Sequence, residues 1–184
     1  MDELILKKNN IITYTKVQMS PIEPKPQDII IRDIAHSLSY MCRANGHIKN
    51  FFSVAQHCIN CSLEARARGL SERIQLALLL HDASEAYISD IIRPVKHNLD
   101  KYLEIESTLQ KTIYDAFGLS DLNEDELHII DEIDNTMLQH EFINLADTKI
   151  FADDMAVSYN HCFDFRDFSE VEEEYLSIFN SLKD

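Results

Sequence analysis

Four side chains of this sequence could together hold a metal ion. His81 and Asp82 are adjacent in LALLLHDASEAYISD, directly after a run of apolar residues, and His57 lies on the segment before them. Asp134 follows in IIDEIDNTMLQHE, where apolar residues mark the neighbouring face as buried. Imidazole nitrogens and carboxylate oxygens from separate segments would suit a transition metal with positions left for water and substrate. An adjacent His and Asp also occur by chance where a helix reaches solvent, and these residues alone leave that alternative open.

Glu85 would belong to the same site if its segment is helical. His81 and Glu85 are four residues apart, and Asp82 and Glu85 are three apart, so one helix face could direct all three into one cleft. An imidazole and a carboxylate are costly to bury without partners, and shared ligation of a cation would satisfy both. A Glu85 side chain on a solvent-facing helix surface is the alternative.

The helices that would position these residues follow from hydrophobic periodicity. Ser53 and Ser71 are typical N-caps, and Gly46, Gly69 and Gly118 are typical helix stops. Three Gly and four Pro in 184 residues favour long helices over a turn-rich β fold. We expect helices over residues 31–46, 53–69, 71–89, 98–118, 123–146 and 169–183.

Residues 1–27 differ from the rest of the chain. The stretch IITYTKVQMSPIEPKPQ begins with β-branched residues and is then interrupted by three prolines, which predicts a short strand or hairpin followed by an extended arm. The sequence therefore predicts an all-α bundle of about six helices over residues 28–184, with the N-terminal segment 1–27 packed on it.

The net charge of −15 excludes one class of partner. Residues 121–184 carry 18 acidic and 3 basic residues, whereas residues 1–120 carry 14 of each. A nucleic-acid polymer needs a basic face, so we expect no duplex DNA or RNA partner. A small anionic substrate is compatible with this net negative charge, because a metal ion and one or two basic side chains can make the electrostatic potential positive at the binding site. The acidic C-terminal third is most simply a solvated helical surface.

We expect a soluble cytoplasmic protein with no membrane partner. No run reaches the about 18 consecutive apolar residues of a membrane span, and the N-terminal MDELILKKNN lacks the pattern of a signal peptide. The four cysteines should therefore be reduced thiols. Cys58 and Cys61 have metal-like spacing but no second ligand pair, so we expect them to be packed helical side chains.

The order of the four predicted ligands resembles a known family. His57, then His81-Asp82, then Asp134 is similar to the H…HD…D signature of the HD-domain metal-dependent phosphohydrolases. The likeness extends to the blocks DIAHSLSYMCRANGH, FFSVAQH, ALLLHDASEAYISDIIRPVK and DNTMLQHE. These look like consecutive blocks of the bacterial and phage branch related to the 5′-deoxynucleotidases, and they cover roughly residues 12–145.

The resemblance implies an HD-domain helical bundle with one divalent cation, which could be Mn, Co, Mg, Fe or Zn, bound by His57, His81, Asp82 and Asp134. It implies a cytoplasmic enzyme that hydrolyses small nucleotides, with release of phosphate from deoxynucleoside 5′-monophosphates as the leading expectation. A homodimer is implied by the resemblance alone. Deoxynucleoside triphosphates, a cyclic dinucleotide or (p)ppGpp stay open as substrates, and so does a nucleotide-sensing module without catalysis.

The resemblance also implies roles for further residues. Glu85 matches a carboxylate that orients or deprotonates the metal-bound water, and Asp90 matches an aspartate that lies near the sugar and assists catalysis or substrate discrimination. Arg43 matches an arginine that contacts the substrate phosphate, for which its planar fork is suited. His47 and Lys96 are further candidates for substrate contacts.

Two departures from the family pattern limit this transfer. Ser89 stands where the branch has Gly before the aspartate, and Asp90 could then be only a helix-terminal cap. Ala44 stands where the deoxynucleotidases usually have Trp, and the chain has no Trp at all. The specificity for base and number of phosphates is therefore not implied. A solvated helix arginine is the alternative for Arg43.

Overall fold

The structure is a computed structural model that describes residues 6–183. Residues 1–5 and 184 lie outside the described residues, and residues 1–5 are the first half of the N-terminal stretch MDELILKKNN. In the described part, eight α-helices and two short 3-10 helices follow a two-stranded hairpin, which confirms the predicted all-α bundle. The elements are β1 (Ile11–Ile12), β2 (Gln18–Met19), η1 (Pro26–Asp28), α1 (Ile31–Tyr40), η2 (Arg43–Gly46), α2 (Val54–Ala67), α3 (Glu72–Leu79), α4 (Glu85–Ile88), α5 (Arg93–Lys96), α6 (Asp100–Ala116), α7 (Glu124–Ala146) and α8 (Phe168–Lys183).

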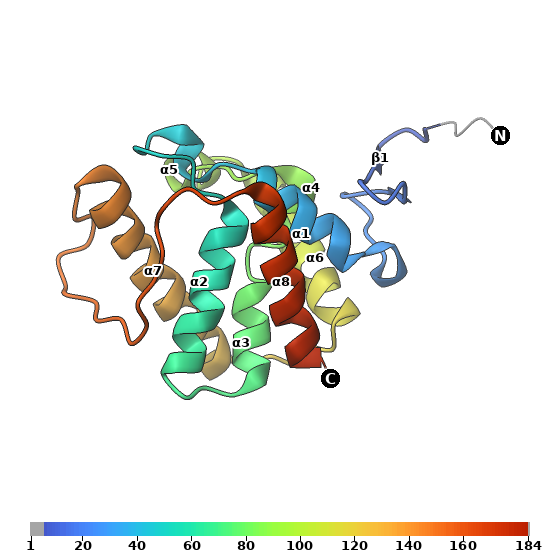
Figure 1. Cartoon of the computed structure of the whole chain (residues 1–184). Helices are drawn as coiled ribbons and strands as arrows, with labels where there is room; N and C mark the ends of the chain where they lie inside the picture. The colour runs from blue at the N-terminus through green and yellow to red at the C-terminus, as the bar shows by residue number, and fades with distance from the viewer. Residues whose placement is uncertain (1–5, 184) are drawn as a thin grey trace.

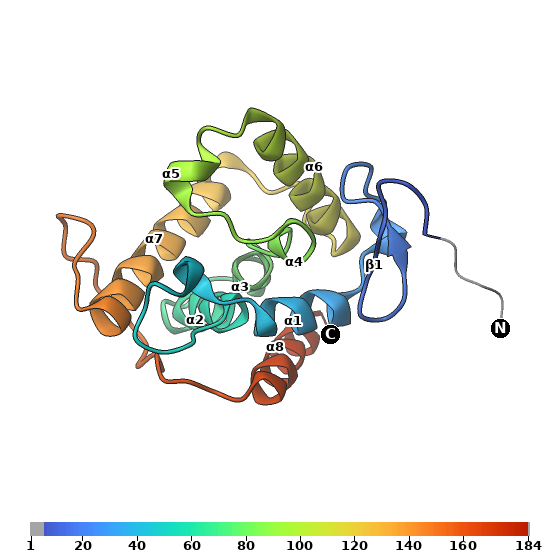
Figure 2. The ribbon, with the colours of Figure 1, turned by 90° about the horizontal axis from the view of Figure 1, so that it is seen from above.

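Helices α2 and α3 form the centre of the bundle. They run side by side, with α7 against them on one side and α8 on the other (Figure 1). Seen from above, α4 lies over the end of α3, and α5 lies between α6 and α7 (Figure 2). Helix α3 is therefore surrounded, and residues 76–80 are at most 4% exposed. This explains why its apolar run has no polar face.

The predicted helix over residues 71–89 is wrong beyond Leu79. The chain forms turns over residues 80–84 before the short helix α4 begins. His81 Nδ1 lies 2.7 Å from the carbonyl oxygen of Leu78, which in a continuing helix would accept the amide of Asp82. The imidazole thus takes the place of that amide and ends the helix. His81 and Asp82 lie on a turn, and they do not share a helix face with Glu85.

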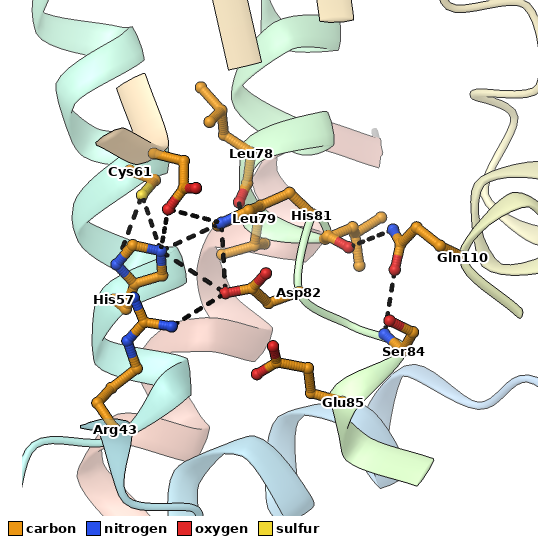
Figure 3. A network of polar contacts seen from close by, with 12 residues as sticks. Arg43, His57, Cys61, Leu78, Leu79, His81, Asp82, Ser84, Glu85 and Gln110 are labelled. Carbon is orange, nitrogen blue, oxygen red and sulfur yellow. Dashed lines mark hydrogen bonds and ion pairs between the residues drawn. The ribbon is translucent and has the colours of Figure 1, made fainter. Parts of the chain in front are cut away.

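Side chains from distant helices hold this turn in place. Tyr175 of α8 donates its hydroxyl to the carbonyl of Leu79 at 2.6 Å. Gln110 of α6 donates to the carbonyl of Leu80 at 2.7 Å and accepts from the amide of Ser84 at 3.1 Å (Figure 3). Because a helix end must find partners for its last carbonyl groups, these contacts stabilise a break that the local sequence does not show.

The predicted helix over residues 31–46 is too long. Helix α1 ends at Tyr40, and the chain then runs extended, with the amide of Arg43 bonded to the carbonyl of Phe52 at 2.9 Å. Ala44 and Asn45 have φ values of 52° and 49°, in the left-handed region that interrupts a right-handed helix. Arg43 therefore lies at a sharp turn at the start of η2, outside helix α1.

Helices α2, α3 and α7 begin directly after residues whose side chains cap them. Ser53 accepts from the amide of Gln56 at the start of α2, and Ser71 accepts from the amide of Ile74 at the start of α3. Asn123 forms a capping box with the third residue of α7. The caps at Ser53 and Ser71 are local and were predicted from the sequence, whereas the cap at Asn123 was not.

Residues 147–167 connect α7 to α8 in a long loop that passes along α2 (Figure 1). Three side chains spaced four residues apart on α2 bind its backbone. Gln56 donates at 3.1 Å, Asn60 donates at 3.3 Å, and the Glu64 carboxylate accepts at 2.8 Å. These polar side chains, all on one face of α2, fix the loop that closes this side of the bundle.

The N-terminal segment packs on α1. Strands β1 and β2 pair antiparallel, as the hairpin prediction expects, and Met19 is 1% exposed. The turn between the strands is tied to α1, because Thr15 donates its amide to Asp33 Oδ1 at 2.6 Å and its hydroxyl to Oδ2 at 2.8 Å. Within residues 6–183, none of the helices combines the length and the apolar character that crossing a bilayer requires.

Candidate metal centre

His57, His81, Asp82 and Asp134 converge beside the end of α3. His57 Nε2 lies 3.1 Å from both His81 Nε2 and Asp134 Oδ1. Asp82 Oδ2 lies 3.7 Å from His57 Nε2 and 3.4 Å from His81 Nε2, while Asp134 Oδ1 lies 3.7 Å from His81 Nε2. With metal–ligand bonds of about 2.1 Å, ligand atoms lie about 3.0 Å apart at a right angle and about 3.4 Å apart at the tetrahedral angle. These distances fit ligand atoms arranged around a common centre.

The two imidazoles present unprotonated nitrogens to this centre. His57 Nδ1 lies 2.5 Å from Glu141 Oε1, and His81 Nδ1 lies 2.7 Å from the carbonyl of Leu78. Because ionised carboxylate and carbonyl oxygens only accept hydrogen bonds, both Nδ1 atoms carry the hydrogen. In neutral rings the two Nε2 lone pairs then face each other at 3.1 Å. Such an arrangement is stable only with a proton or a cation between the nitrogens.

The surrounding carboxylates favour positive charge here. Burial lowers the pKa of His57, but the nearby Glu141 and Asp134 carboxylates contribute to holding it well above its usual value. Burial also lowers the pKa of His81, and the Asp82 carboxylate contributes to raising it well above its usual value. The electrostatics and the geometry agree that the space between the rings suits a cation.

Each of the two aspartates also contacts an arginine. Arg43 Nη1 lies 3.4 Å from Asp82 Oδ2, and its side chain is only 12% exposed. Arg93 Nη2 lies 2.7 Å from Asp134 Oδ2, which leaves Oδ1 directed at the imidazoles. The sequence analysis did not identify Arg93, although it lies in the quoted block ALLLHDASEAYISDIIRPVK.

Glu85 supplies a buried carboxyl group next to the centre. The residue is 3% exposed, and its Oε2 atom has no hydrogen-bond partner among the described residues. Burial and the charges of Asp82 and Asp90 raise the pKa of Glu85 well above its usual value. Lys96 Nζ lies 3.9 Å from its Oε1 atom. Figure 3 shows the carboxyl group beside Asp82, although the two residues do not lie on one helix.

A cavity of about 410 Å³ lies beside these side chains. Eight charged residues line it, and among them are Arg43, Asp82, Glu85, Asp90, Arg93, Lys96 and Asp134. The apolar part of its lining comes mainly from one face of α7 and from the two loops that meet the end of that helix. These apolar residues include Ile48, Leu138, Phe142, Leu145 and Ile150.

The predicted substrate contacts divide into two groups. Arg43, Asp90 and Lys96 line the cavity, and Lys96 Nζ is held by Glu106 Oε1 at 2.6 Å. His47 does not line the cavity, because the left-handed turn before it leaves the residue exposed on the surface. The structure therefore does not bring His47 to the site.

The backbone before Asp90 explains one departure from the family pattern. Ser89 has φ 76° and ψ 154°, a combination that glycine adopts without strain and other residues avoid. Ser89 thus occupies a glycine conformation at the position where the pattern that the sequence resembles has glycine. Asp90 does not cap α5, which has no side-chain cap. Burial and the charge of Asp82 raise the pKa of Asp90.

Two thiols lie behind the imidazoles. Cys58 and Cys61 are fully buried on α2, as the sequence predicts for packed side chains. Sγ of Cys61 lies within 4.8 Å of ligand atoms of His57 and His81, and Sγ of Cys58 lies within 4.8 Å of those of His81 and Asp82. Histidine, cysteine and aspartate side chains that could bind a metal ion are thus gathered at this centre.

Glu141 is the second residue that the sequence analysis missed. It ends the block DNTMLQHE and lies seven residues after Asp134, which is two turns along the same face of α7. The residue is 3% exposed and lines the cavity. Its spacing from Asp134 was the available signal, but the acidic composition of this third of the chain indicated a solvated surface.

Comparison with known proteins identifies relatives without assigning an activity. No protein-family model matches the chain. The chain is similar to the uncharacterized protein YfdR of Escherichia coli, with 41% identity over 92 residues, 50% of this chain and 49% of the relative. It is also similar to an uncharacterized protein of Rhodobacter capsulatus, with 43% identity over 103 residues, 53% of each chain. The chain thus spans about half the length of the curated relatives it matches.

Proposed function

We propose that this chain is a metal-dependent phosphohydrolase of the HD-domain type, and that it releases phosphate from deoxynucleoside 5′-monophosphates. The observation that carries the proposal is the pair of facing Nε2 atoms, 3.1 Å apart, with two carboxylate oxygens at ligand spacing. Both carboxylates line a cavity that could admit a substrate. Packing alone would not stabilise two nitrogen lone pairs that are directed at one point.

His57, His81, Asp82 and Asp134 would hold one divalent cation. Two nitrogen and two oxygen donors suit Mn, Fe, Co or Zn better than Mg, which prefers oxygen ligands. When bound, such an ion supplies a Lewis acid for a phosphate oxygen and a water molecule of lowered pKa.

Arg43 would bind the substrate phosphate. Its guanidinium group lies at the wall of the cavity, and its contacts with Asp82 and Glu141 are all 3.4 Å long. Three of its five N–H donors make these long contacts, and the other two, on Nη1 and Nη2, would be available to a phosphate oxygen, for which the planar fork is suited. Lys96 adds a second positive charge to the lining.

Glu85 would accept the proton of the attacking water at its Oε2 atom. This atom is buried and unpartnered, so a water molecule is the group that would satisfy it. The raised pKa of Glu85 makes its carboxylate a stronger base than an exposed glutamate. Lys96, 3.9 Å from the other oxygen, would balance the charge of the ionised form.

The apolar part of the cavity would receive the sugar and the base. Phe142 and Leu138 of α7 add side chains without hydrogen-bonding groups to the lining of the cavity. At about 410 Å³ the cavity is at the small end of the roughly 300–1,000 Å³ range of ligand pockets. This size favours a single nucleotide over a cyclic dinucleotide.

The test is a phosphate-release assay with protein loaded separately with Mn, Co, Mg, Fe and Zn. The substrates are the four deoxynucleoside monophosphates, the triphosphates, (p)ppGpp and a cyclic dinucleotide. We expect release from the monophosphates and its loss in His81→Ala and Asp134→Asn. Glu132→Gln, an exposed substitution on α7, is the control that should keep activity. Absence of release from every substrate with every metal would refute the proposal, and nucleotide binding without release would instead indicate a sensing module.

A further inference from the structure

The two oxygens of Glu141 serve different partners. Oε1 accepts from Nδ1 of His57 at 2.5 Å, and Oε2 accepts from Nε and Nη2 of Arg43, both at 3.4 Å. The Glu141 side chain is 4% exposed, and that of His57 is fully buried. One buried carboxylate therefore contacts both a candidate metal ligand and the candidate phosphate-binding residue.

We propose that Glu141 is a positioning residue that sets the orientation of His57 and Arg43 together, so that metal binding and phosphate binding both depend on it. This inference rests on the proposed function, because that function assigns the roles of the two partners. Glu141 itself touches neither the metal nor the substrate in this proposal.

The contact with His57 acts on the metal. A carboxylate on Nδ1 fixes the ring orientation, keeps the hydrogen on Nδ1 and makes Nε2 a better donor. Nε2 of His57 lies 3.1 Å from both His81 Nε2 and Asp134 Oδ1, so a rotation of this ring would disturb the whole set of candidate ligands. Loss of such an outer partner typically weakens metal affinity about 10- to 100-fold.

The contact with Arg43 acts on the phosphate. Glu141 takes the Nε and Nη2 edge of the guanidinium group, which leaves Nη1 directed toward Asp82, 3.4 Å away. Without Glu141, the nearest carboxylate partner of Arg43 would be Asp82 itself. Arg43 would then pair with Asp82 and compete with the metal ion for this carboxylate. Its guanidinium group would also lose the orientation in which it could bind phosphate.

The alternative is that Glu141 only balances the charge of a buried arginine. A residue with that role alone would affect folding stability, but it would not alter the affinity for metal or phosphate in protein that remains folded. The shared contacts predict loss of both affinities, and this separates the two interpretations.

The experiment compares Glu141→Gln with Glu132→Gln, a matched change on the same helix at an exposed position. Cobalt affinity is measured by titration of the visible absorption of bound Co²⁺. The affinity of the cobalt-loaded protein for inorganic phosphate is measured by calorimetry. Circular dichroism establishes that each variant is folded.

For Glu141→Gln we expect cobalt binding weaker by about 10- to 100-fold and weaker phosphate binding at saturating cobalt, with neither change in Glu132→Gln. Should Glu141→Gln fail to fold, Glu141→Asp keeps the charge and shortens the reach by one methylene group, and the same two losses are expected. Cobalt affinity equal to that of the control overturns the inference, and so does unchanged phosphate affinity. Neither measurement needs turnover, so an absence of phosphatase activity would refute the proposed function without deciding the role of Glu141.

Discussion

Replacing Ser89 by glycine should stabilise this protein. A non-glycine residue at φ 76° and ψ 154° costs of order 1–3 kcal/mol in backbone strain. Two hydrogen bonds hold the residue there, from its amide to the carbonyl of Glu85 at 2.8 Å and from the Tyr102 hydroxyl to its carbonyl at 2.7 Å. Both involve the backbone of residue 89, so a glycine would keep them.

The net effect follows from two opposing contributions. Glycine removes the strain of about 1–3 kcal/mol from the folded state. It also gives the unfolded chain more conformational entropy, which lowers the free energy of unfolding by about 0.4–1 kcal/mol. The Ser89 side chain is exposed and makes no hydrogen bond in the described part of the chain, so its removal costs little. We therefore expect Ser89→Gly to raise the free energy of unfolding by about 1 kcal/mol. For a chain of this length that corresponds to a Tm increase of about 2–4 °C.

The assay is thermal and urea unfolding of wild type, Ser89→Gly and Ser89→Ala, followed by circular dichroism. Alanine removes the same hydroxyl group but keeps the Cβ atom that causes the strain, so it should give no increase in Tm. A Ser89→Gly protein no more stable than Ser89→Ala would show that the backbone at this position is not strained.

Two further predictions concern groups away from the ligand atoms. Replacing Gln110 by Ala removes its bonds to the carbonyl of Leu80 and the amide of Ser84; urea unfolding should show a loss of about 1–3 kcal/mol, and a cobalt titration should show weaker metal binding. Stability lost without any change in cobalt affinity would mean that Gln110 does not hold the ligand turn. Burial raises the pKa of Glu64, but Arg68, His161 and the amide of Ser158 outweigh it, and the folded-state pKa is lowered. The stability that Glu64 contributes is therefore complete above its unfolded pKa of about 4.3 and is lost as the pH falls through the lower folded value. Tm measured from pH 7 to about pH 2.5 should fall less steeply in Glu64→Gln than in wild type, and parallel curves would contradict this.

Local signals were sufficient to predict much of the fold. The caps at Ser53 and Ser71 and the amphipathic segments lie within one or two helical turns of what they determine. The break after Leu79 could not be predicted in this way. It depends on Tyr175 of α8 and Gln110 of α6, which are distant from Leu79 in the sequence.

The candidate site was predictable to the extent that its residues have distinctive types. An adjacent His and Asp with a second His and a later Asp form a pattern, whereas Glu141 is one of many acids in an acidic region. The interpretation of that region as a solvated surface holds for Glu132, whose side chain is 59% exposed, but not for Glu141. What distinguishes the two is the face of α7 on which each lies, and hence the packing of α7 against α2 and α3.

The break in α3 is also what allows two neighbouring residues to serve one centre. On a continuous helix, adjacent side chains point about 100° apart and do not face each other, so His81 and Asp82 would diverge from a common centre. On the turn, Nε2 of His81 and Oδ2 of Asp82 lie 3.4 Å apart. The imidazole contributes to this geometry together with Tyr175 and Gln110, because its Nδ1 bond to the carbonyl of Leu78 takes the place of a helix amide and directs Nε2 at His57. The apolar run before His81 forms a buried base for the turn, since residues 76–80 are packed in the core and at most 4% exposed.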